Sequence, residues 1–163
     1  MKIGIVYTIG HSNHSIEWFI RLLKENKIAL LIDARSSPYS RYNQQFSKES
    51  LEAALVQNDI VYAYHGNSLG GKPSDPSCYD ENAVNYGKIR EKEWFQQAVA
   101  YVCWESQNQI LALMCAEEDP KECHRHNLVA QELLARGIEV IHIRGDGKLE
   151  EASRNQEQLS LFQ

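Results

Sequence analysis

Short apolar segments alternate with longer segments of helical periodicity along most of this chain. The apolar segments have the length and composition of buried strands and lie at residues 3–9, 28–34, 60–64, 110–115 and 138–143. Because strands that alternate with helices form βαβ units, the pattern predicts a three-layer α/β/α fold. A mostly parallel sheet of about five strands would then be covered by helices on both faces.

The segments between the predicted strands carry apolar side chains on one helical face. Ser15 is a suitable N-cap for the first of these helices, and Ser47 for the second. The helices are expected at residues 15–26, from Ser47 onward, at 93–105 and at 120–136.

The last of these helices has the clearest signals for its two ends. Asp119 can cap it, Pro120 suits its first position, and Gly137 suits the C′ position after its last turn. In a helix that begins there, Cys123, His124 and Arg125 fall in the first turns, where backbone N–H groups favour anions and thiolates.

A chain of 163 residues with 43% hydrophobic and 24% charged residues fits one globular domain. We assign residues 1–144 to an α/β domain and residues 145–163 to a polar tail. Residues 66–92 are rich in Gly, Pro, Ser and Asn, which predicts a long functional loop. Residues 145–157 are polar and predict a flexible segment.

Composition also bears on compartment and partners. The N-terminal residues do not resemble a signal peptide, and no apolar run approaches membrane-spanning length. The four cysteines show no disulfide framework, so we expect a cytoplasmic protein with reduced thiols. A formal net charge of −5 argues against binding nucleic acid through overall charge.

Polar side chains follow several predicted strands, and parallel strands bring their carboxyl ends to one edge of a sheet. We therefore expect one pocket there, which binds an oxyanion. The candidate catalytic residues are His11, Cys115, Glu117, Cys123 and His124. The candidate anion-binding residues are Arg35, Arg41, Lys72 and Arg125. Glu117 is expected to orient a cationic side chain rather than to react.

Each candidate also has a purely structural interpretation. Cys115 ends a buried strand and can be a packing residue, and the same holds for Cys123. A metal site from these cysteines and nearby histidines is disfavoured, because no paired C-x-x-C or other zinc spacing is present. No cofactor is expected either, since neither a G-x-G-x-x-G nor a Walker pattern occurs.

Several ordered motifs together resemble the family called domain of unknown function 488. They are Thr8-Ile9-Gly10-His11-Ser12, Asp33-Ala34-Arg35-Ser36-Ser37-Pro38 with Ser40-Arg41, Leu69-Gly70-Gly71, Leu113-Met114-Cys115-Ala116-Glu117 and Cys123-His124-Arg125. The resemblance spans about residues 7–143, with Ala34 where the family more often has Val. It implies a compact α/β fold with one polar pocket, and it supplies no reaction.

The C-terminal residues Gln158, Leu159, Ser160, Leu161 and Phe162 resemble a bacterial sliding-clamp-binding motif. An extended tail can place Leu161 and Phe162 in an apolar groove while Gln158 fixes the register. The alternative is that these apolar side chains pack back on the domain.

Three functions remain open at this point. The first is an enzyme that acts on a nucleotide, a nucleic-acid end or a base lesion and is recruited to DNA by the clamp. The second is a non-catalytic module that binds a small anion or nucleic acid. The third is a sulfur-transfer or redox protein that uses Cys115 and Cys123.

Overall fold

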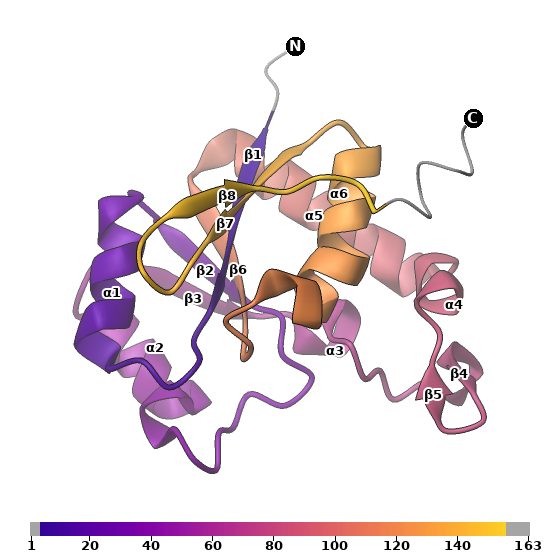
Figure 1. Ribbon diagram of the computed structural model, residues 1–163, viewed down its shortest axis with the longest axis horizontal. Helices are drawn as coiled ribbons and strands as arrows, with labels where there is room; N and C mark the ends of the chain where they lie inside the picture. Colours follow the sequence, from indigo (N-terminus) through magenta and orange to yellow (C-terminus); the bar gives the residue numbers. More distant parts are fainter. Residues whose placement is uncertain (1–3, 156–163) are drawn as a thin grey trace.

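The computed structural model describes residues 4–155, and a six-stranded sheet forms its centre (Figure 1). The strands lie in the order β3-β2-β6-β1-β7-β8, and all neighbours are parallel except β8, which runs antiparallel to β7. Their bounds are β1 (Ile5–Gly10), β2 (Leu30–Asp33), β3 (Val61–Tyr64), β6 (Leu111–Cys115), β7 (Glu139–Ile143) and β8 (Leu149–Glu151). The prediction of a mostly parallel sheet is confirmed.

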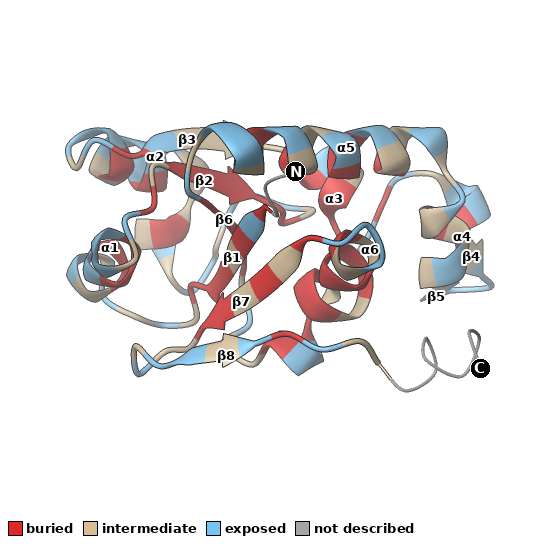
Figure 2. Cartoon of the chain, turned by 90° about the horizontal axis from the view of Figure 1, so that it is seen from above, coloured by how far each residue is buried: buried red, intermediate tan, exposed pale blue. Residues whose placement is uncertain are grey.

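Helices cover both faces of this sheet, with α1 and α2 on one side and α5 and α6 on the other (Figure 2). The α-helices are α1 (Ile16–Glu25), α2 (Lys48–Val56), α3 (Gly66–Leu69), α4 (Tyr86–Arg90), α5 (Glu93–Asn108) and α6 (Gln131–Ala135). Three 3₁₀ helices, η1 (Gln44–Phe46), η2 (Pro76–Cys78) and η3 (Pro120–Glu122), and the π-helix η4 (Arg125–Ala130) complete the helical elements.

The core is divided by the sheet into two apolar clusters. Along β6, Leu111 and Leu113 face the cluster under α5, whereas Ala112 and Met114 face the cluster under α1 and α2. Every residue of β6 is buried, as expected for a strand with helices on both faces. This double burial explains why β6 is a continuous apolar run in the sequence.

Local capping follows the sequence at several points. The Ser15 hydroxyl accepts a hydrogen bond from the Trp18 N–H at 3.1 Å, and Gly137 has a positive φ of 83°. Ser47 begins α2 with extended backbone, but its hydroxyl accepts from the Ser40 N–H instead of capping the helix.

Two stretches are more ordered than expected. Residues 66–92, predicted to be a loop, contain α3, η2, α4 and a small hairpin of β4 (Tyr79–Asp80) and β5 (Ala83–Val84). These elements are too short for apolar periodicity to reveal them. The expectation of a flexible segment over residues 145–157 is wrong for residues 149–151, because β8 pairs with β7 through the backbone there.

The predicted continuous helix 120–136 is also wrong. Asp119 accepts a hydrogen bond from the Lys121 N–H at 3.0 Å, but it caps only the short η3. Cys123 is extended, with φ −138° and ψ 150°, and a second helical segment begins after it. The thiol of Cys123 therefore lies in a break between two helices.

The topology leaves a crevice between the ends of β1 and β6. From β1 the chain crosses to β2 through α1 on one face, and from β6 it crosses to β7 through η4 and α6 on the other. Adjacent strand ends whose chains leave in opposite directions form a topological switch point, where open α/β sheets bind ligands. The sequence predicts a site at the carboxyl ends of the strands, and this crevice lies at that edge of the sheet.

Candidate functional site

A pocket of about 830 Å³ opens at the switch point. Its volume is in the usual range for small-molecule sites, about 300–1,000 Å³. Its walls include nearly all the side chains predicted from the sequence, namely His11, Arg35, Arg41, Lys72, Cys115, Glu117, Cys123 and His124. Small polar residues fill the space between them, namely Ser12, Asn13, Ser36, Ser37, Ser40 and Asn43.

Gly10 allows the end of β1 to approach the loop after β6. A Cβ atom at this position would lie 1.7 Å from the backbone oxygen of Glu117. Gly10 is also the register partner of Cys115, and the His11 N–H donates to the Cys115 carbonyl at 2.9 Å. This close approach is the steric reason for a glycine at position 10.

Arg35 is held by a buried ion pair. Its Nε and Nη2 donate to the two carboxylate oxygens of Asp33 at 2.9 and 2.8 Å, and Nη2 also donates to the Pro38 carbonyl. Asp33 accepts a further hydrogen bond from the Tyr62 hydroxyl at 2.6 Å, and burial with this bond raises the pKa of Tyr62. Asp33 thus neutralises Arg35, which was predicted to bind an anion.

The guanidinium of Arg35 also contacts the imidazole of His11 in the pocket. Nη1 of Arg35 lies 3.3 Å from Nε2 of His11, and an arginine can only donate. Nδ1 of His11 donates to the Ser12 carbonyl at 2.8 Å, which fixes the proton on Nδ1. Of the five N–H groups of Arg35, one on Nη1 is left for a ligand. Its main role in this geometry is to orient His11.

His11 is neutral in this environment. The imidazole stacks on Phe46, with ring centroids 4.6 Å apart, and is 3% exposed. Burial lowers its pKa from 6.5 to about 4, an effect that the hydrogen bond to Ser12 opposes and the charge of Arg35 reinforces. Ser12 itself has a left-handed φ of 47°, uncommon for a non-glycine residue and typical of tight functional turns.

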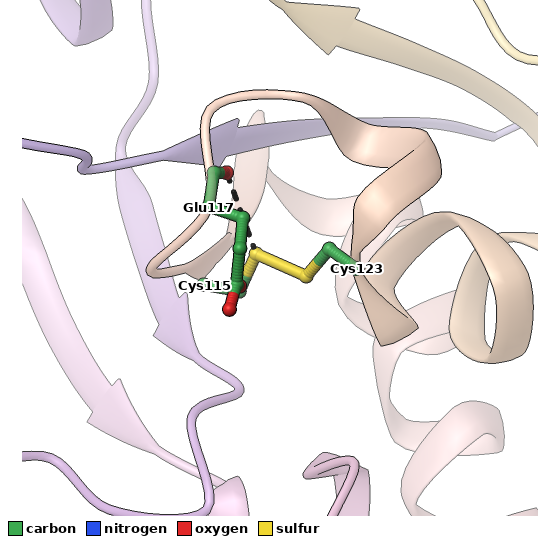
Figure 3. Close-up of side chains that lie close together, drawn as sticks. All are labelled: Cys115, Glu117 and Cys123. Carbon is green, nitrogen blue, oxygen red and sulfur yellow. Dashed lines mark hydrogen bonds between the residues drawn. A yellow bond between two sulfur atoms is a disulfide. The ribbon is translucent and has the colours of Figure 1, made fainter.

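Cys115 and Cys123 meet at the floor of the pocket. Their Sγ atoms are joined in a disulfide bond, although they are eight positions apart in sequence (Figure 3). The expectation of reduced thiols is therefore wrong for this pair, because the fold brings the two sulfurs together. Cys115 comes from the end of β6, and Cys123 from the break between η3 and η4. The extended backbone of Cys123 directs its sulfur toward Cys115, and this sulfur also accepts the Arg125 N–H at 3.5 Å.

His124 lies beside this pair with a defined tautomer. Its Nε2 donates to the Ala34 carbonyl at 2.9 Å, so the lone pair is on Nδ1. Nδ1 lies 3.6 Å from the sulfur of Cys123. Burial lowers the pKa of His124. Gly71 packs against this ring, and a Cβ there would lie 3.0 Å from the Cβ of His124.

The remaining charged residues of the pocket are exposed. Glu117 lies two positions after Cys115, and Figure 3 shows its side chain beside the two sulfurs. Arg41 and Lys72 lie on the outer wall, and the Lys72 N–H donates to the Ser36 hydroxyl at 2.8 Å. Because Asp33 neutralises Arg35, attraction for an anion falls to Arg41 and Lys72, and the exposed carboxylates of Glu117 and Glu122 on the same wall oppose it.

Arg125 does not line the pocket. It is fully buried, and its Nη2 donates to the Glu118 carbonyl at 2.6 Å. Its Nε and Nη1 have no hydrogen-bond partner among residues 4–155. Burial lowers its pKa from 12.5 to about 10, and the charges of Glu118 and Glu117 oppose this change. Arg125 is the first residue of η4, and its side chain points into the protein, away from the ligand space.

Phe46 and Tyr62 were not predicted as parts of the site, and Asp33 was named only within a motif after the second strand, without a role. Asp33 is the last residue of β2, two positions before Arg35, and this spacing is the one signal that could have indicated the pair. Phe46 and Tyr62 come from η1 and β3, and nothing in their sequence surroundings distinguishes them from core residues.

Comparison with known proteins yields one match. No curated protein and no solved structure matches the chain significantly. No described helix has both the length and the apolar character needed to cross a membrane. The model of one family, the domain of unknown function DUF488, matches residues 15–132, a span that includes most of the pocket motifs. The chain therefore belongs to the DUF488 family.

Proposed function

We propose that this protein is a thiol-dependent enzyme of the redox or sulfur-transfer class, with Cys123 as the attacking thiol and Cys115 as the resolving thiol. The observation that carries the proposal is the contact between these two sulfurs inside the pocket. A pair of cysteines at a ligand-binding switch point is placed for chemistry on a bound substrate, whereas a purely structural crosslink has no need of a pocket.

The surroundings of Cys123 favour its role as nucleophile. The Arg125 N–H donates to its sulfur, and Nδ1 of His124 is an available base 3.6 Å away. A positioned imidazole that accepts the thiol proton activates a cysteine nucleophile. The Cys115 sulfur instead lies 3.8 Å from the Glu117 carbonyl oxygen, which can accept a hydrogen bond but does not take up the thiol proton.

The proposed cycle is balanced in electrons and protons. The Cys123 thiolate attacks a sulfur of a substrate disulfide, forms a mixed disulfide and releases the first substrate thiolate. The Cys115 thiolate then attacks Cys123, releases the second substrate thiolate and leaves the Cys115–Cys123 disulfide. The substrate is reduced, the protein dithiol is oxidised, and a cellular dithiol reductant restores it. Such a cycle suits the cytoplasm, where thiols are kept reduced.

The outer wall of the pocket suggests a substrate with negative charge. Arg41 and Lys72 are exposed there, and serine hydroxyls supply further hydrogen bonds. We propose a small anionic disulfide or related sulfur compound up to the size of a nucleotide. If the thiols prove inert, the same wall supports the second candidate, a module that binds anions without catalysis.

The test uses full-length reduced protein and glutathione disulfide as an anionic probe, with chelator present. We expect two glutathione molecules to be released per chain and the Cys115–Cys123 disulfide to form. Cys115→Ser should trap glutathione on Cys123, and His124→Gln should slow this step about 100-fold. Cys103→Ser, outside the pocket, is the matched control. Equal trapping on Cys115 in Cys123→Ser would contradict the assigned roles.

Substrate charge is tested with the same reaction. Cystamine is a cationic disulfide, which Arg41 and Lys72 should repel. At low salt, wild-type protein should therefore react faster with the anionic glutathione disulfide than with cystamine. Arg41→Ala with Lys72→Ala should reduce this preference, because it removes the two exposed cations of the wall. An unchanged preference in the double variant would exclude these two residues as the anion site.

The tail supports a further proposal, that the enzyme works near DNA. Gln158, Leu159, Leu161 and Phe162 lie outside the described residues, so the sliding-clamp interaction and the nucleotide or nucleic-acid substrate stay predictions. Recruitment through a tail would give an acidic protein access to DNA without a basic surface.

A further inference from the structure

The floor of the pocket combines donor atoms that a metal ion prefers. The two sulfurs of Cys115 and Cys123 and a carboxylate oxygen of Glu117 all lie within 4.8 Å of one another (Figure 3). A tetrahedral zinc ion with Zn–S bonds of about 2.3 Å holds two sulfurs roughly 3.8 Å apart. The three donor atoms therefore lie within reach of one ion once the bond between the two sulfurs is broken.

The backbone separation of the two cysteines suits this arrangement. Their Cα atoms are 7.5 Å apart, beyond the usual disulfide range of about 4.4–6.8 Å. After reduction, the two thiols can separate by side-chain rotation alone and admit an ion between them. The chain separation of eight residues matches no zinc motif, so the fold, and not the local sequence, brings the donors together.

His124 adjoins this group through Cys123, although it is not one of the three residues whose donor atoms lie within 4.8 Å of one another. Its Nε2–H is bound to the Ala34 carbonyl, which leaves Nδ1 unprotonated beside Cys123. Histidine ligands of metals commonly donate their other ring N–H to a carbonyl in this way. The Arg125 N–H that donates to the Cys123 sulfur is a second outer contact of the same kind.

Arg125 adds an independent observation. Its side chain is fully buried, and two of its nitrogens have no partner within the described part of the chain. It interacts electrostatically with Glu117, one of the donor residues. Two thiolates and a carboxylate around a divalent cation carry one net negative charge, which would compensate this buried cation.

We infer that the reduced protein binds a thiophilic divalent cation, zinc above all, through Cys115, Cys123, Glu117 and His124. Cysteine sulfur with imidazole and one carboxylate is a donor set suited to zinc and unsuited to magnesium or calcium. Glu117 is exposed, so this ligand position is open to exchange with water or substrate. Oxidation of the two thiols to the disulfide would release the ion, and the inference does not require the redox cycle proposed above.

The experiment is a zinc titration of reduced, chelator-treated full-length protein in competition with a chromophoric chelator. One ion per chain should bind, and Cys115→Ser or Cys123→Ser should weaken binding by about 100-fold or more, since each removes a thiolate ligand. Glu117→Gln should weaken it less, by about 10-fold. Cys103→Ser, which removes a thiol outside the pocket, should bind as the wild type does.

Cobalt binding is measured on the wild-type protein, so this test does not depend on the folding of a variant. Substitution of Co²⁺ should give a thiolate-to-metal charge-transfer band and the visible bands of a tetrahedral site. Absence of a one-to-one complex in the reduced wild type, or equal zinc affinity in a Cys115→Ser/Cys123→Ser double variant, would overturn the inference. Thiol exchange measured in chelator tests the enzyme proposal alone, so the two can fail separately.

Discussion

Removal of Arg35 should destabilise the protein far more than removal of an exposed arginine. In Arg35→Ala the carboxylate of Asp33 loses its charged partner while it stays fully buried. Breaking a buried ion pair in this way costs about 3–5 kcal/mol. The Tyr62 hydroxyl and the Arg35 backbone N–H still donate to Asp33, so we expect the lower end of this range.

The expected loss is about 3 kcal/mol in the free energy of unfolding, which for a chain of this size lowers Tm by roughly 6–12 °C. Urea unfolding followed by circular dichroism measures it. Arg21→Ala is the matched control, because Arg21 pairs with Glu25 at 3.0 Å but both side chains are more than half exposed. That change should cost about 0.5 kcal/mol or less.

A double variant separates lost charge balance from lost packing. Asp33→Asn combined with Arg35→Ala removes the stranded charge and should recover part of the stability. If Arg35→Ala lowers the free energy of unfolding no more than Arg21→Ala does, the buried ion pair does not stabilise the protein. If the double variant is no more stable than Arg35→Ala, the loss arises from packing and not from the carboxylate.

Three further predictions follow from other parts of the molecule. Gly10→Ala should cost several kcal/mol and impair thiol exchange, because the new Cβ would lie 1.7 Å from a backbone oxygen. Gly87→Ala is the control and should cost little, because the nearest atom to its new Cβ is a side-chain oxygen at 3.1 Å. Equal Tm values for the two variants would refute the steric argument. Burial lowers the pKa of His142 to about 3 in the folded state, so the unfolded chain binds its proton first. The stability it contributes is complete above about pH 6.5 and is lost toward pH 3. Its share of the slope, near 1.4 kcal/mol per pH unit, should be absent in His142→Gln, whereas the share of other buried histidines such as His11 should remain. In the tail, Phe162→Ala should weaken binding to a bacterial sliding clamp by about 2 kcal/mol, roughly thirty-fold, in calorimetry. No binding by the full-length protein would refute the motif, and a lower Tm after deletion of residues 158–163 would indicate packing on the domain.

The layers of the fold could be predicted because the apolar pattern records burial directly. All five predicted strands exist, and their ends differ from the expected bounds by a few residues. β8 escaped prediction because it is an edge strand held by backbone hydrogen bonds, and only Glu150 of its three residues is partly buried. An edge strand with such residues has no alternating apolar signal.

The members of the site could be predicted, but their partners could not. Strand ends in a parallel sheet converge whatever their sequence, so His11, Arg35 and Cys115 had to lie near one another. Whether Arg35 faces a ligand or a protein carboxylate depends on the rotamers of Asp33 and Tyr62. No local pattern encodes that choice, and the charge of Arg35 therefore suggested an anion site that Asp33 already satisfies.

The break at Cys123 organises the whole pocket, and helix-capping rules alone predict the opposite. Asp119 and Pro120 provide good starting signals, yet a continuous helix would place Cys123 on a helical turn. Extended backbone at Cys123 instead sends three successive side chains in three directions. The sulfur of Cys123 reaches Cys115 on β6, the imidazole of His124 reaches the Ala34 carbonyl after β2, and the guanidinium of Arg125 enters the interior beside Glu118. A regular helix rotates successive residues by a fixed 100° and cannot make these three contacts at once. The local helical preference is therefore overridden by contacts to two strands, and those contacts set the thiol and the imidazole at the distance on which both the proposed thiol chemistry and the metal site depend.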